Sequence, residues 1–245
     1  MAIQNGNTPS KQKPFNAAVH FNTDLAEKYD ENIRLFCTSY DVLHEMVLNW
    51  LRNQPERSKF LSSGAGTGTE ILCLGKHFPL WQFTAVDVSA SMITTCQKRV
   101  TQAGMDNRVK FSIGRVEDFH STFQFDSASS IFVSHFIKER EDKLKYFGSI
   151  AANLKSGAPF ILADLFGAKD SDEFQCLSAA WLVSCESQGW SAEVLIKNEN
   201  HIERDISFIP ETELFAILIE AGFEVPVRFY QTYLFGAWIT WKRSQ

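Results

Sequence analysis

Residues 61–69 read LSSGAGTGT and place three glycines between a short apolar run and a run with helical periodicity. Glycine lets the backbone turn sharply, and it lets a ligand approach main-chain atoms that a Cβ would otherwise cover. The helix that follows would present free N–H groups and the positive end of its dipole to the turn. The spacing is GxGxG and differs from the dinucleotide-binding GxGxxG, because Thr69 stands at the last position. The stretch predicts either a ligand-binding turn or a merely tight connection between strand and helix.

Apolar runs and helical runs alternate on the C-terminal side of this turn. The apolar runs occupy residues 60–61, 83–86, 109–113, 128–133 and 160–165, and helical periodicity occupies residues 69–77, 89–103 and 138–154. This alternation predicts βαβ units with right-handed crossovers and a parallel sheet. The carboxyl ends of such strands meet at one edge, where ligands bind. Two more helices are expected over residues 170–189 and 210–221, the second ended by Gly222.

The two ends of the chain depart from this alternation. Helical periodicity at 24–36 and 41–51 precedes the first strand, and the strand-like runs 223–230 and 232–242 follow each other with no helix between them. We therefore expect an α/β fold: a Rossmann-like, doubly wound, mostly parallel seven-stranded sheet with an antiparallel C-terminal hairpin and N-terminal lid helices. Residues 1–15 are expected to be a flexible leader, and residues 16–245 a single domain in which 16–52 form the lid helices.

Composition excludes several classes of function. The chain has 245 residues with 24 basic and 29 acidic side chains, a net charge of −5, and no run of five basic residues, which disfavours nucleic acid as a partner. No 18-residue apolar window is present, so no membrane span is expected. Five cysteines without paired spacing indicate reduced thiols in a cytoplasmic protein and no metal site. The 21 Phe, 6 Trp and 5 Tyr predict an aromatic-rich core or a pocket for a flat or apolar small molecule.

Two further segments contain candidate ligand-binding residues. Asp87 ends the second predicted strand, where a carboxylate can accept hydrogen bonds from both hydroxyls of a ribose; alternatively it caps the helix that opens at Ser89. The segment 114–119, GRVEDF, follows the third strand. In adenosine sites a residue here reads the adenine amino group while the next backbone N–H meets a ring nitrogen; equally, Glu117 and Asp118 could cap a short helix.

His135 is the leading catalytic candidate. It follows the fourth predicted strand at the edge where a substrate would meet a cofactor, and an imidazole with an ordinary pKa of about 6.5 suits a general base near neutrality. The alternative is a histidine that packs beside Phe136 and orients the loop. Candidates of second rank are His20, Tyr29, Asp164 and His201.

Several segments together resemble the class I S-adenosylmethionine-dependent methyltransferases. They are LSSGAGTGT, AVDVSASM, GRVEDF, FDSASSIFVSHFI, LKSGAPFILADLF and AGFEV…FGAWITWK, within residues 21–242. AVDVSASM is similar to the D-x-S-x-x-M pattern of the family at Asp87, Ser89 and Met92, and the terminal hairpin also resembles this family, whereas nicotinamide-binding domains lack it. The resemblance implies S-adenosyl-L-methionine as the cofactor and methyl transfer to a small-molecule acceptor.

Within that superfamily the chain is most similar to the branch that contains carboxy-S-adenosylmethionine synthase. The similarity rests on Ser39-Tyr40, the glycine turn, and residues 229–231 with 235–236. It implies a homodimer and a cofactor pocket lined by Tyr40, Gly64, Ala65, Gly66, Asp87, Val88 and Ser134; the family motifs add Met92, Arg115, Val116 and Glu117.

Three positions depart from the pattern of that resemblance. Ser62 stands where the family has an acidic residue near the amino group of the cofactor, so another group or a water must substitute. Arg115 stands where an acid is common, and Glu199 where the synthase has the arginine that clamps its extra carboxylate. A glutamate there would repel that carboxylate. The alternatives to a small-molecule methyltransferase are a carboxy-S-adenosylmethionine synthase-like enzyme of tRNA wobble-uridine modification and a degenerate adenosyl-binding subunit.

Overall fold

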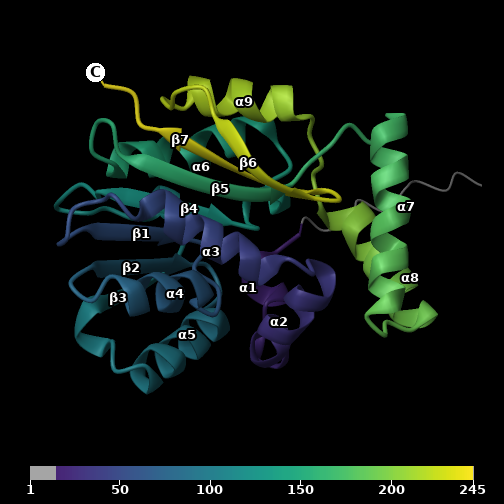
Figure 1. Ribbon diagram of the computed structural model, residues 1–245, viewed down its shortest axis with the longest axis horizontal. Coiled ribbons are helices and arrows are strands. Elements are labelled where there is room, and N and C mark those ends of the chain that lie inside the picture. The colour runs from purple at the N-terminus through teal and green to yellow at the C-terminus, as the bar shows by residue number, and fades with distance from the viewer. Residues whose placement is uncertain (1–14, 245) are drawn as a thin grey trace, which may run out of the picture.

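In the computed structural model, which describes residues 15–244, seven strands form one sheet in the order β3-β2-β1-β4-β5-β7-β6. The first five strands are parallel, and β7 is antiparallel to both β5 and β6 (Figure 1). This confirms the predicted doubly wound sheet. The strands are β1 (Lys59–Ser63), β2 (Gln82–Asp87), β3 (Val109–Ile113), β4 (Ser127–Ile131), β5 (Pro159–Leu165), β6 (Val227–Thr232) and β7 (Phe235–Trp241).

The C-terminal hairpin forms as predicted, with β7 inserted next to β5 and β6 at the edge. Its first strand begins four residues later than the sequence indicates. Before it, only an isolated bridge joins Phe223 to Lys242, and Pro226 has no backbone N–H to donate to a ladder. The chain reverses at Tyr233, which has a positive φ of 48°.

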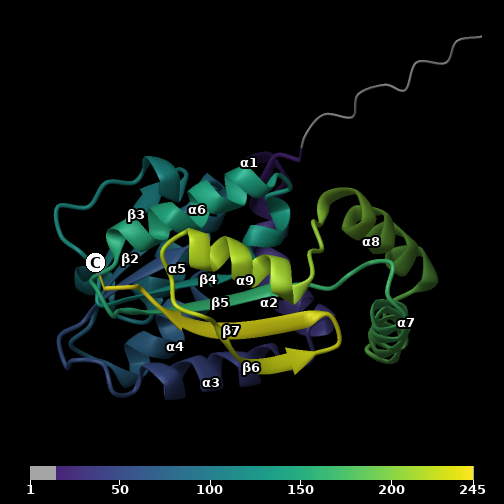
Figure 2. The same cartoon turned by 90° about the horizontal axis from the view of Figure 1, so that it is seen from above.

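Helices cover both faces of the sheet (Figure 2). One layer contains α3 (Tyr40–Leu51), α4 (Thr69–His77) and α5 (Ala90–Gln102), and the other contains α6 (Arg140–Asn153) and α9 (Glu211–Glu220). In α3 the buried residues Leu43, Val47 and Leu51 recur every four positions and so form one apolar face. All seven residues of β5 are buried, as expected for a central strand with helices on both faces.

The remaining helices lie outside these two layers. The short α1 (Ala17–His20) and α2 (Thr23–Phe36) lie at the carboxyl edge of the parallel strands, and α7 (Asp172–Ser187) and α8 (Ala192–Asp205) form a pair that projects from the sheet (Figures 1 and 2). Of the helices predicted as a lid, only α1 and α2 lie across that edge, because α3 packs in the layer on the sheet. The predicted leader lies outside the described residues except for Phe15.

Helix α8 is not among the helices predicted from the sequence. Its sequence, AEVLIKNENHIERD, is mostly polar, and Ile202 is its only large apolar residue after Ile196. A local signal was nevertheless present, since the Ser191 side chain accepts a hydrogen bond from the Val194 amide and thus caps the helix. In the described part of the chain, no helix is both long enough and apolar enough to span a membrane.

Gly64 illustrates why the turn after β1 requires glycine. Its φ is +76°, and a Cβ built there would lie 2.2 Å from Cγ2 of Val133. We expect Gly64→Ala to lower the free energy of unfolding by about 2–4 kcal/mol, from backbone strain together with overpacking. Gly148, within α6, has no atom within 4 Å of a built Cβ, so Gly148→Ala should stabilise the protein by about 0.5–1 kcal/mol. Urea unfolding measures both, and equal effects would contradict this account.

Candidate functional site

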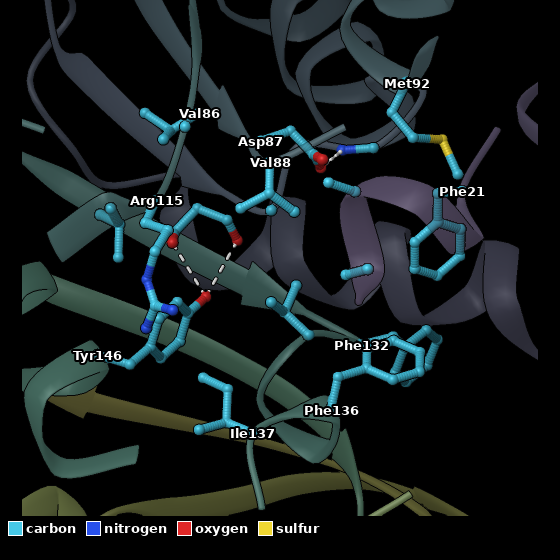
Figure 3. Close-up of a pocket in the computed structure, with 18 of the residues that line it drawn as sticks. Phe21, Val86, Asp87, Val88, Met92, Arg115, Phe132, Phe136, Ile137 and Tyr146 are labelled. Carbon is cyan, nitrogen blue, oxygen red and sulfur yellow. Dashed lines mark hydrogen bonds between the residues drawn. The ribbon is translucent and has the colours of Figure 1, made fainter. Parts of the chain in front are cut away.

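A cavity of about 650 Å³ opens at the carboxyl edge of the parallel strands. Its volume is within the range of ordinary small-molecule and cofactor sites. In Figure 3, Arg115 and Tyr146 lie at one end of the cavity, and Met92 and Phe21 at the other. The polar part of the wall is formed by Ser63, Gly64, Gly66, Asp87, Arg115, Glu117 and Asp118, and the apolar part by residues that include Phe15, Phe21, Tyr29, Val88, Met92, Val116, Phe132, Phe136, Ile137 and Tyr146.

The Asp87 side chain, at the tip of β2, is hydrogen-bonded to the glycine turn. Its Oδ2 accepts a hydrogen bond from the Gly66 amide at 2.8 Å, and its Oδ1 accepts one from the Ser89 amide at 2.8 Å. Burial raises the pKa of this carboxyl, and the two amide donors oppose the shift. The side-chain cap of α5 is Ser89, whose hydroxyl accepts from the Met92 amide. The alternative in which Asp87 serves as the helix cap is therefore wrong.

The segment after β3 forms the short helix η2 (Val116–Asp118) at the cavity wall. The Nε of Arg115 donates to Oε1 of Glu117 at 3.1 Å, and its Nη2 makes a second bond to the same atom. The start of η2 has no side-chain cap, so neither Glu117 nor Asp118 performs the capping role that the sequence allowed. Arg115 cannot accept a hydrogen bond, whereas Glu117, with only one oxygen engaged by Arg115, can accept more.

The structure brings most of the predicted cofactor residues to this one cavity. Eight line it: Gly64, Gly66, Asp87, Val88, Met92, Arg115, Val116 and Glu117. Three others lie behind the wall. Tyr40 is 5% exposed and its ring packs on His44 at a centroid distance of 4.5 Å. Ala65 is buried within the turn, and the Ser134 hydroxyl donates to Asp164.

His135 also lies behind the wall, in a buried polar cluster at the tips of β4 and β5. Its Nδ1 is hydrogen-bonded to Oδ1 of Asp164, and its ring packs beside Phe136, which does line the cavity, at a centroid distance of 4.2 Å. The bond to Asp164 favours the tautomer that carries the proton on Nδ1 and leaves a lone pair on Nε2. Within the described residues, Nε2 makes no hydrogen bond.

Charged partners set the state of Asp164. Burial by itself would raise the pKa of this carboxyl, but the charge and hydrogen bond of His135 lower it below its ordinary value, with help from Lys143 and Ser134. Lys143 is itself buried; its Nζ donates to the Ser134 carbonyl at 2.5 Å, and burial lowers its pKa. The cluster thus contains a buried carboxylate held by an imidazole and an ammonium group. Among the residues that the structure describes, no cluster has the composition of a metal site.

Sequence reasoning missed several residues of the wall. Tyr146 belongs to α6, where no motif singles it out; its hydroxyl accepts from Oγ of Ser63 at 2.9 Å and is hydrogen-bonded to Oγ of Ser130 at 2.8 Å. Phe21 precedes α2 and reaches the cavity from the N-terminal side. Both depend on packing between elements distant in sequence, so no local signal could have identified them.

Part of the chain is similar in sequence to known methyltransferases. Residues 61–160 match the family model described as a methyltransferase domain. A malonyl-[acyl-carrier protein] O-methyltransferase of Priestia megaterium is 32% identical over 110 residues, which is 42% of this chain and 38% of that relative. The match therefore spans less than half the length of the curated relative.

Solved structures support the same fold. The magnesium protoporphyrin IX methyltransferase of Synechocystis PCC 6803, solved with bound S-adenosylhomocysteine, has a TM-score of 0.67 at 13% identity and covers 93% of this chain and 98% of its own. A putative O-methyltransferase of Nostoc punctiforme PCC 73102 has a TM-score of 0.67 at 14% identity, with 90% and 59% covered. Residues 61–160 are thus similar to a methyltransferase domain, and the sheet that contains them has the Rossmann-like fold of these solved structures.

Proposed function

We propose that the protein is an S-adenosylmethionine-dependent methyltransferase that acts on a small-molecule acceptor. The observation that carries the proposal is the convergence, in one cavity, of the glycine turn, the Asp87 carboxylate and the 114–118 segment within a methyltransferase domain. The −5 net charge and the aromatic wall support a small, apolar acceptor over a nucleic acid.

The donor set fits such a cofactor. Each oxygen of Asp87 accepts one backbone amide, so the carboxylate keeps lone pairs for the two hydroxyls of a ribose. Val88 and Val116 offer apolar faces to an adenine ring, and Glu117, held by Arg115, offers an acceptor for its amino group. Tyr40, Ala65 and Ser134, which the resemblance places at the cofactor, would act from behind the wall by holding these residues in place.

When bound, S-adenosylmethionine supplies a methyl group that is already activated by its sulfonium. The protein then has to bind and orient an acceptor, exclude water and, for a hydroxyl acceptor, remove a proton. Phe21, Tyr29 and Phe136 provide an aromatic surface for the acceptor. The base that we propose is His135, whose Nδ1 is held by Asp164 and whose ring packs against Phe136 of the cavity wall.

The test is a transfer assay with methyl-labelled cofactor and a panel of hydroxyl-bearing aromatic acceptors, with formation of S-adenosylhomocysteine as the readout. Acceptor-dependent product supports the proposal. Cofactor binding without transfer to any acceptor would favour the degenerate adenosyl-binding subunit, for which the Arg115–Glu117 ion pair at the adenine position is the specific observation.

Three finer expectations stay predictions. The homodimer and the cytoplasmic location follow from the resemblance and the reduced cysteines. The branch that contains carboxy-S-adenosylmethionine synthase depends on position 199, and the side chain of Glu199 lies outside the described residues.

A further inference from the structure

Glu70 is a buried carboxylate that is hydrogen-bonded to Ser62, two residues before the first glycine of the turn. It is the second residue of α4 and only 5% exposed, and its Oε1 accepts hydrogen bonds from the hydroxyl of Ser62 on β1 and, at 2.7 Å, from that of Ser129 on β4. These two strands are neighbours in the sheet, so the carboxyl group bridges them near the carboxyl end of β1. Ser62 occupies the position where the resemblance expects an acidic side chain, and its hydroxyl instead donates to a carboxylate from the next helix.

Glu70 has no cationic partner among the described residues. The other carboxylates near the turn do have partners: Asp30 pairs with Arg99 at 2.7 Å, Asp87 accepts two backbone amides, and Glu117 pairs with Arg115. A buried carboxylate without a positive partner is costly, so it either stays protonated or is ionised only when a cation arrives.

In the protein without a bound ligand, the surroundings of Glu70 favour the protonated carboxyl. Burial raises the pKa of Glu70 to about 7, although the hydrogen bonds from Ser62 and Ser129 oppose the shift. The titratable groups that face it are Tyr29 on α2, Tyr40 on α3, Cys73 on α4 itself and Cys96 on α5. All four have pKa values raised by burial, so they remain neutral at pH 7. The carboxyl groups of Asp30 and Asp87 supply no positive charge.

We propose that Glu70 is the counter-charge for the amino-acid ammonium group of the cofactor, in place of the acid that position 62 lacks. This inference rests on the proposed function. Glu70 does not itself line the cavity, but its partner Ser62 is followed directly by Ser63 and Gly64, which do. A positive group brought to the turn favours the ionised form of Glu70. Cofactor binding below pH 7 therefore releases a proton from Glu70.

Calorimetry tests this directly. S-adenosylhomocysteine keeps the ammonium group and cannot transfer a methyl group, whereas 5′-methylthioadenosine lacks the amino-acid part. Titrations at pH 6, 7 and 8, each in two buffers of different ionisation enthalpy, give both affinity and protons released. We expect S-adenosylhomocysteine to release a proton at pH 6 and to bind about tenfold more tightly at pH 8 than at pH 6. 5′-Methylthioadenosine should release none.

Glu70→Gln isolates the group responsible, because the amide oxygen can still accept from both serines. The variant should lose the proton release and the pH dependence, yet bind 5′-methylthioadenosine as the wild type does, which shows an intact site. Glu45→Gln, an exposed carboxylate on α3, is the matched control and should behave as the wild type. Proton release that persists in Glu70→Gln, or its absence in the wild type, overturns the assignment of Glu70. Failure of both ligands to bind the wild type contradicts the proposed function as well.

Discussion

His135→Ala lowers the rate of methyl transfer by about 100- to 10,000-fold while leaving cofactor affinity unchanged. The size of the loss is that of a removed general base. Cofactor affinity is preserved because His135 is only 4% exposed and does not line the cavity wall. The comparison is made by single-turnover transfer with the best acceptor, and by calorimetry with S-adenosylhomocysteine.

Asp164→Asn is the companion variant. An asparagine can donate to Nδ1 and so favour the wrong tautomer, with the proton on Nε2, which would disable the base while conserving volume. We expect a loss of similar size. If His135→Ala keeps wild-type turnover, the base assignment is wrong, and the interpretation of His135 as a residue that packs beside Phe136 stands.

Asp87→Ala weakens cofactor binding by about 1–3 kcal/mol, or roughly 5- to 150-fold in dissociation constant. The substitution removes the acceptor proposed for the ribose hydroxyls and also the bond that holds the Gly66 amide. Calorimetry with S-adenosylhomocysteine measures the loss, and urea unfolding verifies that the variant is folded.

Asp87→Asn separates the two effects of that substitution. The amide retains one oxygen, which can still accept from the Gly66 amide, but it supplies fewer acceptors for two hydroxyls. Its affinity should therefore fall between those of wild type and Asp87→Ala. Unchanged affinity in both variants would refute the ribose assignment.

Elements with strong local signals could be predicted from the sequence. The bounds of α4, Thr69–His77, agree to the residue because the glycine turn sets its start and the chain leaves the helix at Phe78. The central strand β5 was found because its apolar run is nearly continuous, as expected when both faces are buried. In contrast, α8 has few apolar residues, and its serine cap alone was not enough to reveal it.

Residues of the candidate site could be predicted only where a recognisable motif also stands directly after a predicted strand. Gly64, Gly66 and Asp87 meet these conditions and line the cavity. Ser134 follows β4 as expected, yet its side chain turns to Asp164, a partner 30 residues away. Glu70 reaches Ser129 across 59 residues. Such contacts depend on strand order and helix packing, which a single sequence does not specify.

The measurement that tests the central claim most directly is native mass spectrometry of the freshly purified protein, alone and after addition of S-adenosylmethionine, followed by denaturing release of the ligand. The account predicts one S-adenosylmethionine or S-adenosylhomocysteine per chain, and the intact mass also reports whether the protein is a dimer. A released ligand heavier by one carboxyl group would redirect the function to the synthase-like alternative. A protein that carries no adenosyl ligand and binds none when it is added would contradict the account.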